Sequence, residues 1–161
     1  MEELLPYAEK IAALLKSRNE TIAIAESSAG GLITAALLAV PGASAYCIGS
    51  AVLYTRKSML ALTAVEPDAL AGLTPGTEAA SLFRAQLIRK RLETTWGISE
   101  TGVAGPTGSR YGYAPGHACV AVSGPVERAR TVETASPDRV RNMYAFATAA
   151  LELLAGALSE R

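Results

Sequence analysis

The spacing of hydrophobic positions changes repeatedly along the chain between helical and strand-like patterns. Apolar residues from Leu4 to Leu15 recur at helical spacing, which predicts an amphipathic helix over residues 3–18. Residues 21–27, TIAIAES, are short, apolar and partly β-branched, as is typical of a buried strand. The next apolar stretch, GGLITAALLAV, predicts a helix that stops at Pro41-Gly42.

The rest of the chain continues this alternation of helices and strands. The remaining predicted elements are a strand at 46–54, a short helix in RKSMLAL, a turn at 67–73, a helix at 78–95, a strand at 98–105, a hairpin of residues 117–123 and 126–134, and a helix at 140–158. Such alternation, with one hairpin, predicts an α/β fold with a mixed sheet. We expect a three-layer α/β/α sandwich with a mixed, mostly parallel sheet, in a single domain over residues 1–161.

Composition narrows the class of protein. Fifteen Lys and Arg residues balance fifteen Asp and Glu residues, which argues against a nucleic acid or an anionic membrane as partner. No apolar run reaches the roughly 18 residues that a membrane span needs, and the first residues are acidic where a signal peptide is basic. We therefore expect a cytoplasmic protein with neither a nucleic-acid nor a membrane partner.

Cysteine and histidine usage gives little support to metal or disulfide chemistry. Cys47 and Cys119 lie in strand-like apolar stretches without C-x-x-C spacing, which favours buried free thiols. The single histidine, His117, begins a predicted strand behind a glycine-rich loop, which favours a structural or ligand-side role over that of a catalytic base. We expect neither a metal nor a cofactor.

Polar and glycine-rich residues follow three of the predicted strands. The three segments are AESSAGG (25–31), LYTRK (53–57) and TGVAGPTGSRYG (101–112). In open α/β sheets, ligands gather where the carboxyl ends of strands open into loops. These segments are therefore the candidates for a binding or catalytic site.

The first segment places Ser27 and Ser28 between a strand and a helix. Unpaired N–H groups at a helix N-terminus can stabilise an anion, and Gly30 and Gly31 allow a ligand to approach the backbone closely. A serine here could be a nucleophile beside an oxyanion hole, or part of a phosphate site. The alternative is that either serine is only the N-cap of the helix.

The other two segments supply the cations. Arg110 is the only cation in the glycine-rich segment, and its guanidinium suits a phosphate or a carboxylate; the alternative is a plain crossover loop. The middle segment carries Tyr54, Arg56 and Lys57 just beyond a strand. A desolvated lysine can act as the base for a serine, whereas an exposed lysine would have no such role.

Taken together, the segments resemble one family, the C-terminal domain of the competence/damage-inducible protein CinA, also known as the stand-alone nicotinamide-nucleotide amidase PncC. AESSAGG resembles the family's AESCTGG, and VPGASAYCIGSAVLY resembles its VPGASAYFxGGVVxY. TGVAGPTG resembles TGIAGPGG, and SPDRVRNMYAFATAALELL resembles the family's closing Asp/Arg-led helix. The resemblance covers nearly the whole chain and implies the family's α/β fold.

The resemblance also implies an activity, which is conversion of nicotinamide mononucleotide to nicotinic acid mononucleotide and ammonia. Ser27 would be the nucleophile, Tyr54 matches the tyrosine of the family's "YS" element, and no metal would be needed. Backbone N–H groups around Ala29 to Gly31 would be reasonable oxyanion donors. The expected substrate-binding residues are Ser28, Ala29, Gly30, Gly31, Thr101, Gly102, Ala104, Gly105, Pro106, Thr107, Gly108 and Arg110. The expected partners are a small-molecule nucleotide and, from the apolar helical faces, further copies of the chain in a homodimer or larger homo-oligomer.

One departure from the family pattern concerns the base. Family members with the motif Y-S-N-E-A-K carry their presumed base lysine five residues after the tyrosine, where this chain has Met59. Lys57 comes two residues earlier, and on a regular helix that shift rotates a side chain by about 200°. We expect Lys57 to reach Ser27 only if this segment is a loop. Two hypotheses follow: an amidohydrolase with Lys57 as base, or a catalytically degenerate nucleotide-binding protein.

Overall fold

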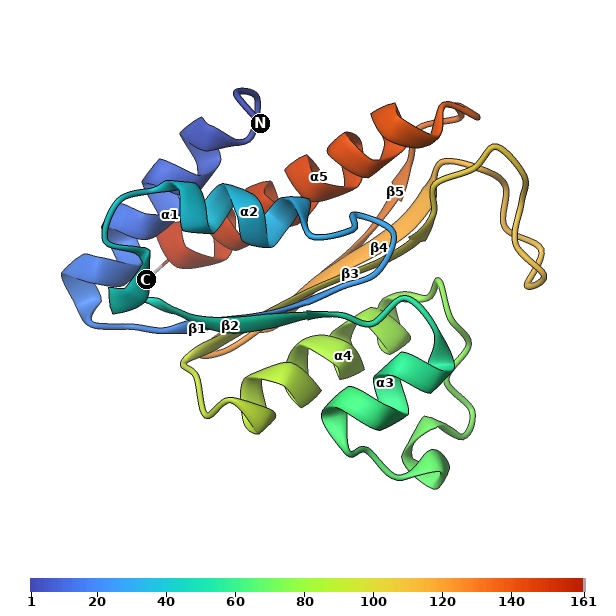
Figure 1. Ribbon diagram of the computed structural model, residues 1–161, viewed down its shortest axis with the longest axis horizontal. Helices are drawn as coiled ribbons and strands as arrows, with labels where there is room; N and C mark the ends of the chain where they lie inside the picture. The colour runs from blue at the N-terminus through green and yellow to red at the C-terminus, as the bar shows by residue number, and fades with distance from the viewer. Residues whose placement is uncertain (161) are drawn as a thin grey trace.

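The computed structural model, which describes residues 1–160, is a five-stranded mixed sheet with helices on both faces (Figure 1). The strands are β1 (Ile22–Glu26), β2 (Cys47–Val52), β3 (Trp96–Val103), β4 (His117–Ser123) and β5 (Arg128–Glu133). The helices are α1 (Leu5–Arg18), α2 (Leu32–Ala39), α3 (Arg56–Thr63), α4 (Glu78–Arg91) and α5 (Arg139–Ser159), with short 3-10 helices η1 (Ala43–Ala45) and η2 (Pro67–Leu70). The predicted three-layer α/β/α sandwich is confirmed.

The strand order brings the three candidate segments to the same end of the sheet, where the parallel strands finish. The order is β2-β1-β3-β4-β5, in which β1 pairs in parallel with both β2 and β3, while β4 is antiparallel to its two neighbours. The sheet is therefore mixed, as predicted, but its strand pairings are not mostly parallel, because two of the four are parallel and two are antiparallel. Because Ala25 lies opposite both Ala51 and Ser99, the carboxyl ends of the three parallel strands lie side by side.

The two faces of β1 pack against different helical layers. Ile22 and Ile24 face the larger core, which α1, α2 and α5 cover, and Ala23 and Ala25 face the smaller one beneath α3 and α4 (Figure 1). This alternation is the period-2 pattern of a strand buried on both faces. The small side chains on the second face, and the absence of a Cβ at Gly97, allow α4 to lie close to the sheet.

The clearest differences from the predicted helix boundaries are the start of α2 and the end of α4. Helix α2 begins at Leu32, because Gly30 and Gly31 have φ values of 67° and 101°, which a helix does not allow. Helix α4 ends at Arg91, before the predicted Thr95, because Glu93 adopts a left-handed conformation with φ 53°. Both breaks lie at the ends of the elements and leave their order unchanged.

The two cysteines are free thiols, as predicted, although only one is fully buried. Cys119 is buried in β4, whereas Cys47 is half-buried at the start of β2. Burial raises the pKa of both thiols, which disfavours the reactive thiolate. Over residues 1–160, the structure contains no group of three or more His, Cys, Asp or Glu side chains able to hold a metal ion. In the same part of the chain, no helix combines the length and apolar character needed to cross a membrane.

Candidate functional site

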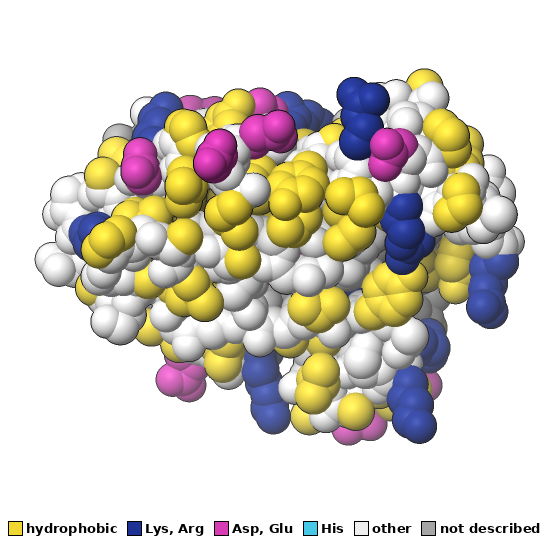
Figure 2. All heavy atoms as spheres, turned by 45° about the horizontal axis from the view of Figure 1, so that its top comes forward, with side chains coloured by type: hydrophobic (Ala, Val, Ile, Leu, Met, Phe, Trp, Pro, Cys, Tyr) yellow, Lys and Arg dark blue, Asp and Glu magenta, His cyan; other side chains and the backbone are white. Residues whose placement is uncertain are grey.

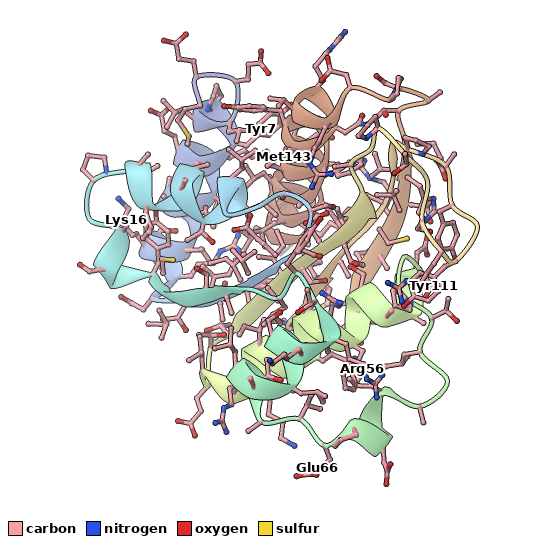
Figure 3. The ribbon with its side chains drawn as sticks, turned by 45° about the vertical axis from the view of Figure 1, so that its right-hand side comes forward. Tyr7, Lys16, Arg56, Glu66, Tyr111 and Met143 are labelled. Atoms are coloured by element: carbon pink, nitrogen blue, oxygen red, sulfur yellow. The ribbon has the colours of Figure 1, made fainter. Side chains whose placement is uncertain are left out.

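A pocket of about 720 Å³ lies where the parallel strands end. It brings together predicted residues from all three candidate segments, because Ser27, Tyr54, Thr101, Gly102 and Arg110 all line it. Figure 3 shows Arg56 at the start of α3 and Tyr111 in the glycine-rich loop, both on this side of the molecule, while Tyr7 and Met143 lie across the sheet. The three predicted segments therefore meet at one pocket.

Other residues predicted to bind substrate do not line this pocket. They are Ser28, Ala29, Gly30, Gly31, Ala104, Gly105, Pro106, Thr107 and Gly108. Ala104 is buried in a small cluster with Phe146 of α5, which turns it away from the pocket. The four residues after Ser27 form the connection to α2 behind the pocket wall, where two carboxylates hold them.

The first of these carboxylates belongs to Glu26, at the end of β1. It is fully buried and accepts hydrogen bonds from the backbone N–H groups of Gly31 at 2.9 Å, Ile33 at 3.1 Å and Thr34 at 2.8 Å, and from the Thr34 hydroxyl at 2.5 Å. A carboxylate at a helix N-terminus satisfies N–H groups that the helix leaves unpaired and is favoured by the helix dipole. Glu26 therefore does what a serine N-cap was expected to do, and neither serine caps α2.

The second carboxylate belongs to Glu100 of β3. It holds the turn of residues 27–31, here called the serine turn. It accepts hydrogen bonds from the backbone N–H groups of Ser27 at 3.0 Å and Ala29 at 2.8 Å, and the Ser28 hydroxyl donates to its other oxygen. Complete burial raises the pKa of Glu100; the three hydrogen bonds oppose this rise, and the charge of Glu26 adds to it. Gly102 helps to seat Ser28, because a Cβ there would come within 2.9 Å of the Ser28 hydroxyl.

These contacts correct the expected oxyanion hole. The N–H of Ala29 already donates to Glu100, the N–H of Gly31 donates to Glu26, and the N–H of Gly30 donates to the Ser27 carbonyl at 3.2 Å. All three donors are engaged within the protein, so they hold the shape of the turn. An oxyanion at Ser27 would have to be stabilised by other groups of the pocket.

Ser27 itself keeps its hydroxyl available on the pocket side. The residue is 7% exposed, and its side chain is part of the pocket wall. Within residues 1–160, the Ser27 hydroxyl forms no hydrogen bond, in contrast with the neighbouring Ser28. The position fits a group that contacts a ligand, because a nearly buried hydroxyl otherwise finds a protein partner.

The expected base, Lys57, lies outside the lining of the pocket that contains Ser27. Helix α3 begins at Arg56, and its capping box is complete: Thr55 accepts from the Ser58 N–H, and the Ser58 hydroxyl accepts from the Thr55 N–H. Lys57 therefore lies in a regular helical turn, and its exposed side chain is not part of the pocket wall. The structure thus corrects the prediction that Lys57 is the base.

Met59 occupies the position that the helix turns toward the site. It is 4% exposed and lines the pocket. A thioether carries no proton-accepting amine, so this position cannot activate a serine. The pocket wall thus has an apolar group at the place where the family motif has its lysine.

Tyr54 lies at the rim of the pocket and is tied to α5. Its ring is 58% exposed, and its hydroxyl accepts a hydrogen bond from Arg139 at 3.1 Å. The same guanidinium donates to the Gly105 carbonyl at 2.6 Å. Arg139, which the sequence did not single out as a site residue, therefore joins the segment after β2 to the glycine-rich loop.

His117 supports the pocket from behind. Its ring stacks on Tyr113 with centroids 4.0 Å apart, and its Nε2 donates to the Gly76 carbonyl at 2.7 Å. Its Nδ1 pairs with Glu133. Tyr113 and Gly76 both line the pocket, so His117 positions two parts of the wall. This arrangement agrees with the structural or ligand-side role that its place in the sequence favoured.

Arg84 is a site residue that sequence reasoning missed. It lies in the middle of α4, is only 9% exposed, and lines the pocket. A signal was present, because the buried residues of α4 recur at helical spacing and Arg84 falls on that stripe: Ala80, Ser81, Arg84, Ala85 and Ile88. An arginine inside an apolar stripe departs from the usual pattern of a solvated helix face.

The pocket is consequently basic. Among residues 1–160, its charged lining residues are Arg56, Arg84 and Arg110, and none is an Asp or a Glu. Figure 2 shows basic side chains gathered at the right-hand end of the molecule, the end at which the glycine-rich loop projects in Figure 1. Apolar groups such as Met59 and Phe83 complete the wall. Such a site suits an anion that also carries an apolar or aromatic part.

Fold and site together define an α/β sandwich whose pocket is built on a serine turn between the first strand and its helix. The sequence profile of the family described as CinA C-terminal domain matches residues 5–158. The chain belongs to the CinA C-terminal domain family.

Individual relatives agree with this assignment. A CinA-like protein of Salinibacter ruber is 38% identical over 86% of this chain, and one of Desulforapulum autotrophicum is 34% identical over 99% of it. The chain spans only 34% and 37% of the length of these two relatives. Among solved structures, CinA superfamily proteins of Klebsiella pneumoniae (21% identity, TM-score 0.89, 98% of this chain and 99% of that one) and Enterobacter cloacae (25%, 0.87, 96% and 92%) share the fold.

Proposed function

We propose that the chain binds an anionic, nucleotide-sized molecule of the pyridine mononucleotide class in the pocket at Ser27. The observation that carries this proposal is the lining of the pocket, to which the described part of the chain contributes three arginines and no carboxylate around a volume of about 720 Å³. Guanidinium groups bind phosphate through paired, charge-assisted hydrogen bonds. A nucleotide also fits the mixed wall, because its base would lie against apolar and aromatic side chains.

Arg56 and Arg110 are the candidates for the phosphate. Both are exposed, and they come from the two sides of the pocket, the start of α3 and the glycine-rich loop. Arg56 makes one long hydrogen bond, to the Pro67 carbonyl at 3.4 Å, which leaves most of its donors for a ligand. Tyr111 and Tyr113 of the same loop could then cover the ligand from outside.

Hydrolysis of an amide is the second candidate function, and the free hydroxyl of Ser27 favours it. Attack on a carboxamide carbon requires a group that takes the serine proton, within about 2.6–3.2 Å of the hydroxyl. Met59 stands where the family motif has that lysine, and Lys57 is exposed outside the pocket. We therefore expect the chain to bind the nucleotide and to hydrolyse it slowly or not at all.

The binding proposal is tested by calorimetric titration of the purified protein with nicotinamide mononucleotide and nicotinic acid mononucleotide at low salt. We expect saturable binding of at least one nucleotide, which weakens as salt screens the exposed arginines. Arg110→Gln should weaken binding by about tenfold, because it removes one charge-assisted phosphate contact. Arg18→Gln, a charge-matched change outside the pocket, serves as control. Absence of saturable binding of both nucleotides would overturn the proposal.

A further inference from the structure

The guanidinium of Arg84 is buried in the pocket wall with few protein partners. It donates to the Leu53 carbonyl at 3.2 Å, which is the one hydrogen bond found for it within residues 1–160. In that part of the chain, no carboxylate oxygen lies within 4.0 Å of it. A guanidinium has five N–H donors, so the donors that Arg84 does not give to Leu53 remain for an acceptor in the pocket that its side chain lines.

Such an arrangement is costly for a protein without a ligand. Burial lowers the pKa of Arg84, and the charge of Glu100 opposes this only from beyond contact distance. A buried charge is normally paired and hydrogen-bonded, because its desolvation is otherwise uncompensated. An anion that entered the pocket would supply such a partner.

We propose that Arg84 binds a carboxylate at the inner end of the pocket, so that the preferred ligand carries a second anionic group in addition to the phosphate held at the mouth. This inference rests on the proposed function and extends it. Arg84 comes from α4 beneath the sheet, whereas Arg56 and Arg110 are exposed on the flanking segments. The buried Arg84 thus suits the carboxylate end of the ligand, and the exposed Arg56 and Arg110 suit its phosphate end.

Hydrogen-bond chemistry favours a carboxylate over a carboxamide at this end. A carboxylate offers two acceptor oxygens, which match two parallel N–H groups of a guanidinium. A carboxamide offers one acceptor, and its NH₂ group would place donors against the donors of Arg84. A nearby apolar wall, with Met59 and Phe83, strengthens this discrimination, because water is less able to replace the missing acceptor.

The inner position also favours a carboxylate over a second phosphate. A phosphate carries more charge and more hydrated oxygens, and only Arg84 among the three pocket arginines is buried. A single guanidinium balances one negative charge, so a second charge would be desolvated without compensation. The ligand class is therefore a heterocyclic carboxylate that bears a phosphate, such as nicotinic acid mononucleotide.

The test compares two ligands that differ only at this group, nicotinic acid mononucleotide and nicotinamide mononucleotide. Calorimetric titration of the wild-type protein should show binding of the acid that is tighter by about tenfold or more. Arg84→Met, which keeps an unbranched apolar stem but removes the charged guanidinium, should abolish this preference by weakening the acid and leaving the amide nearly unchanged. Arg84→Lys keeps the charge without the paired donors and should retain part of the preference. Arg91→Met, an exposed site on the same helix, should leave both affinities unchanged.

Each outcome is informative. Equal affinities for the two ligands in the wild-type protein would overturn the inference and leave the proposed nucleotide binding intact. The same would follow if Arg84→Met weakened both ligands equally. If the wild-type protein bound neither ligand, the proposed function would fail, and this inference would fail with it. The wild-type comparison stands even if Arg84→Met does not fold, which circular dichroism would show.

Discussion

Two buried glutamates hold the serine turn, and they differ in how far along the chain their partners lie. Glu26 binds groups five to eight residues ahead of it, at the start of α2, whereas Glu100 binds groups more than seventy residues before it. Glu26 lies at the positive end of a helix dipole, and Glu100 lies inside the sheet near another negative charge. The first glutamate therefore sets where the helix begins, and the second fixes the turn against the neighbouring strand.

The largest loss of stability is expected when Glu26 is replaced. Glu26→Ala would leave three backbone N–H groups and the Thr34 hydroxyl without their acceptor, so the free energy of unfolding should fall by about 3 kcal/mol or more. Urea unfolding at neutral pH, followed by circular dichroism, measures this loss. Glu26→Gln keeps one acceptor oxygen and should lose less. An unchanged urea midpoint in Glu26→Ala would contradict the capping role.

Glu100 should show a pH dependence that distinguishes it from other carboxylates. Because its pKa in the folded protein lies above the ordinary value of 4.5, the folded state keeps a proton that the unfolded chain releases. Its contribution to the free energy of unfolding is thus fully present below about pH 4.5 and is lost as pH rises through the folded pKa. Glu100→Gln should remove this decline.

The measurement is urea unfolding of both proteins at several pH values from mildly acidic to mildly alkaline. The difference in stability, wild type minus Glu100→Gln, should become less favourable to the wild type as pH rises. If the two proteins kept a constant difference over the whole range, Glu100 would titrate alike in the folded and unfolded states. That result would contradict the conclusion that burial raises the pKa of Glu100.

A smaller effect separates the two adjacent serines. Ser28→Ala removes a hydroxyl that donates to Glu100, so it should lower the free energy of unfolding by about 1–2 kcal/mol and shift the decline with pH to higher values. Ser27→Ala removes a hydroxyl without a protein partner and should cost about 0.5 kcal/mol or less. Because both variants make the same substitution at neighbouring positions, they form a matched pair. Equal losses at both serines would contradict the assignment of different roles.

The smallest loss of stability is expected at Tyr54, on the rim of the pocket. Tyr54→Phe removes the acceptor for Arg139, and because both side chains are exposed the loss of stability should be about 0.5 kcal/mol. Thermal unfolding measures it. A loss above about 2 kcal/mol would mean that the link between β2 and α5 carries more than a surface contact.

The difference between the local partners of Glu26 and the distant partners of Glu100 also explains how much the sequence could predict. Local signals were sufficient for the order of strands and helices, although not for the start of α2 after Gly30 and Gly31. They were also sufficient for the family. The role of Glu100 was not predictable in this way, because it depends on β3 lying beside β1.

Which side chains form the pocket wall was not predictable either, for related reasons. Whether Lys57 faces the pocket depends on where α3 begins, and the capping box of Thr55 and Ser58 settles this at Arg56. Arg84 was missed because a single arginine in a helix is usually solvated, and its burial follows from the packing of α4 on the sheet. The position of Lys57 on α3 and the packing of α4 thus decide which cations line the pocket.

The most direct test of the account is ammonia release from nicotinamide mononucleotide, measured for the wild-type protein beside Met59→Lys and Ser27→Ala. We predict that the wild-type protein binds a nucleotide but releases ammonia no faster than Ser27→Ala does. Met59→Lys, which places an amine on the pocket wall, should raise the rate by about a hundredfold or more, the contribution typical of a positioned base. Rapid, Ser27-dependent release by the wild-type protein would contradict the account, since it would show that this pocket hydrolyses the amide without the lysine.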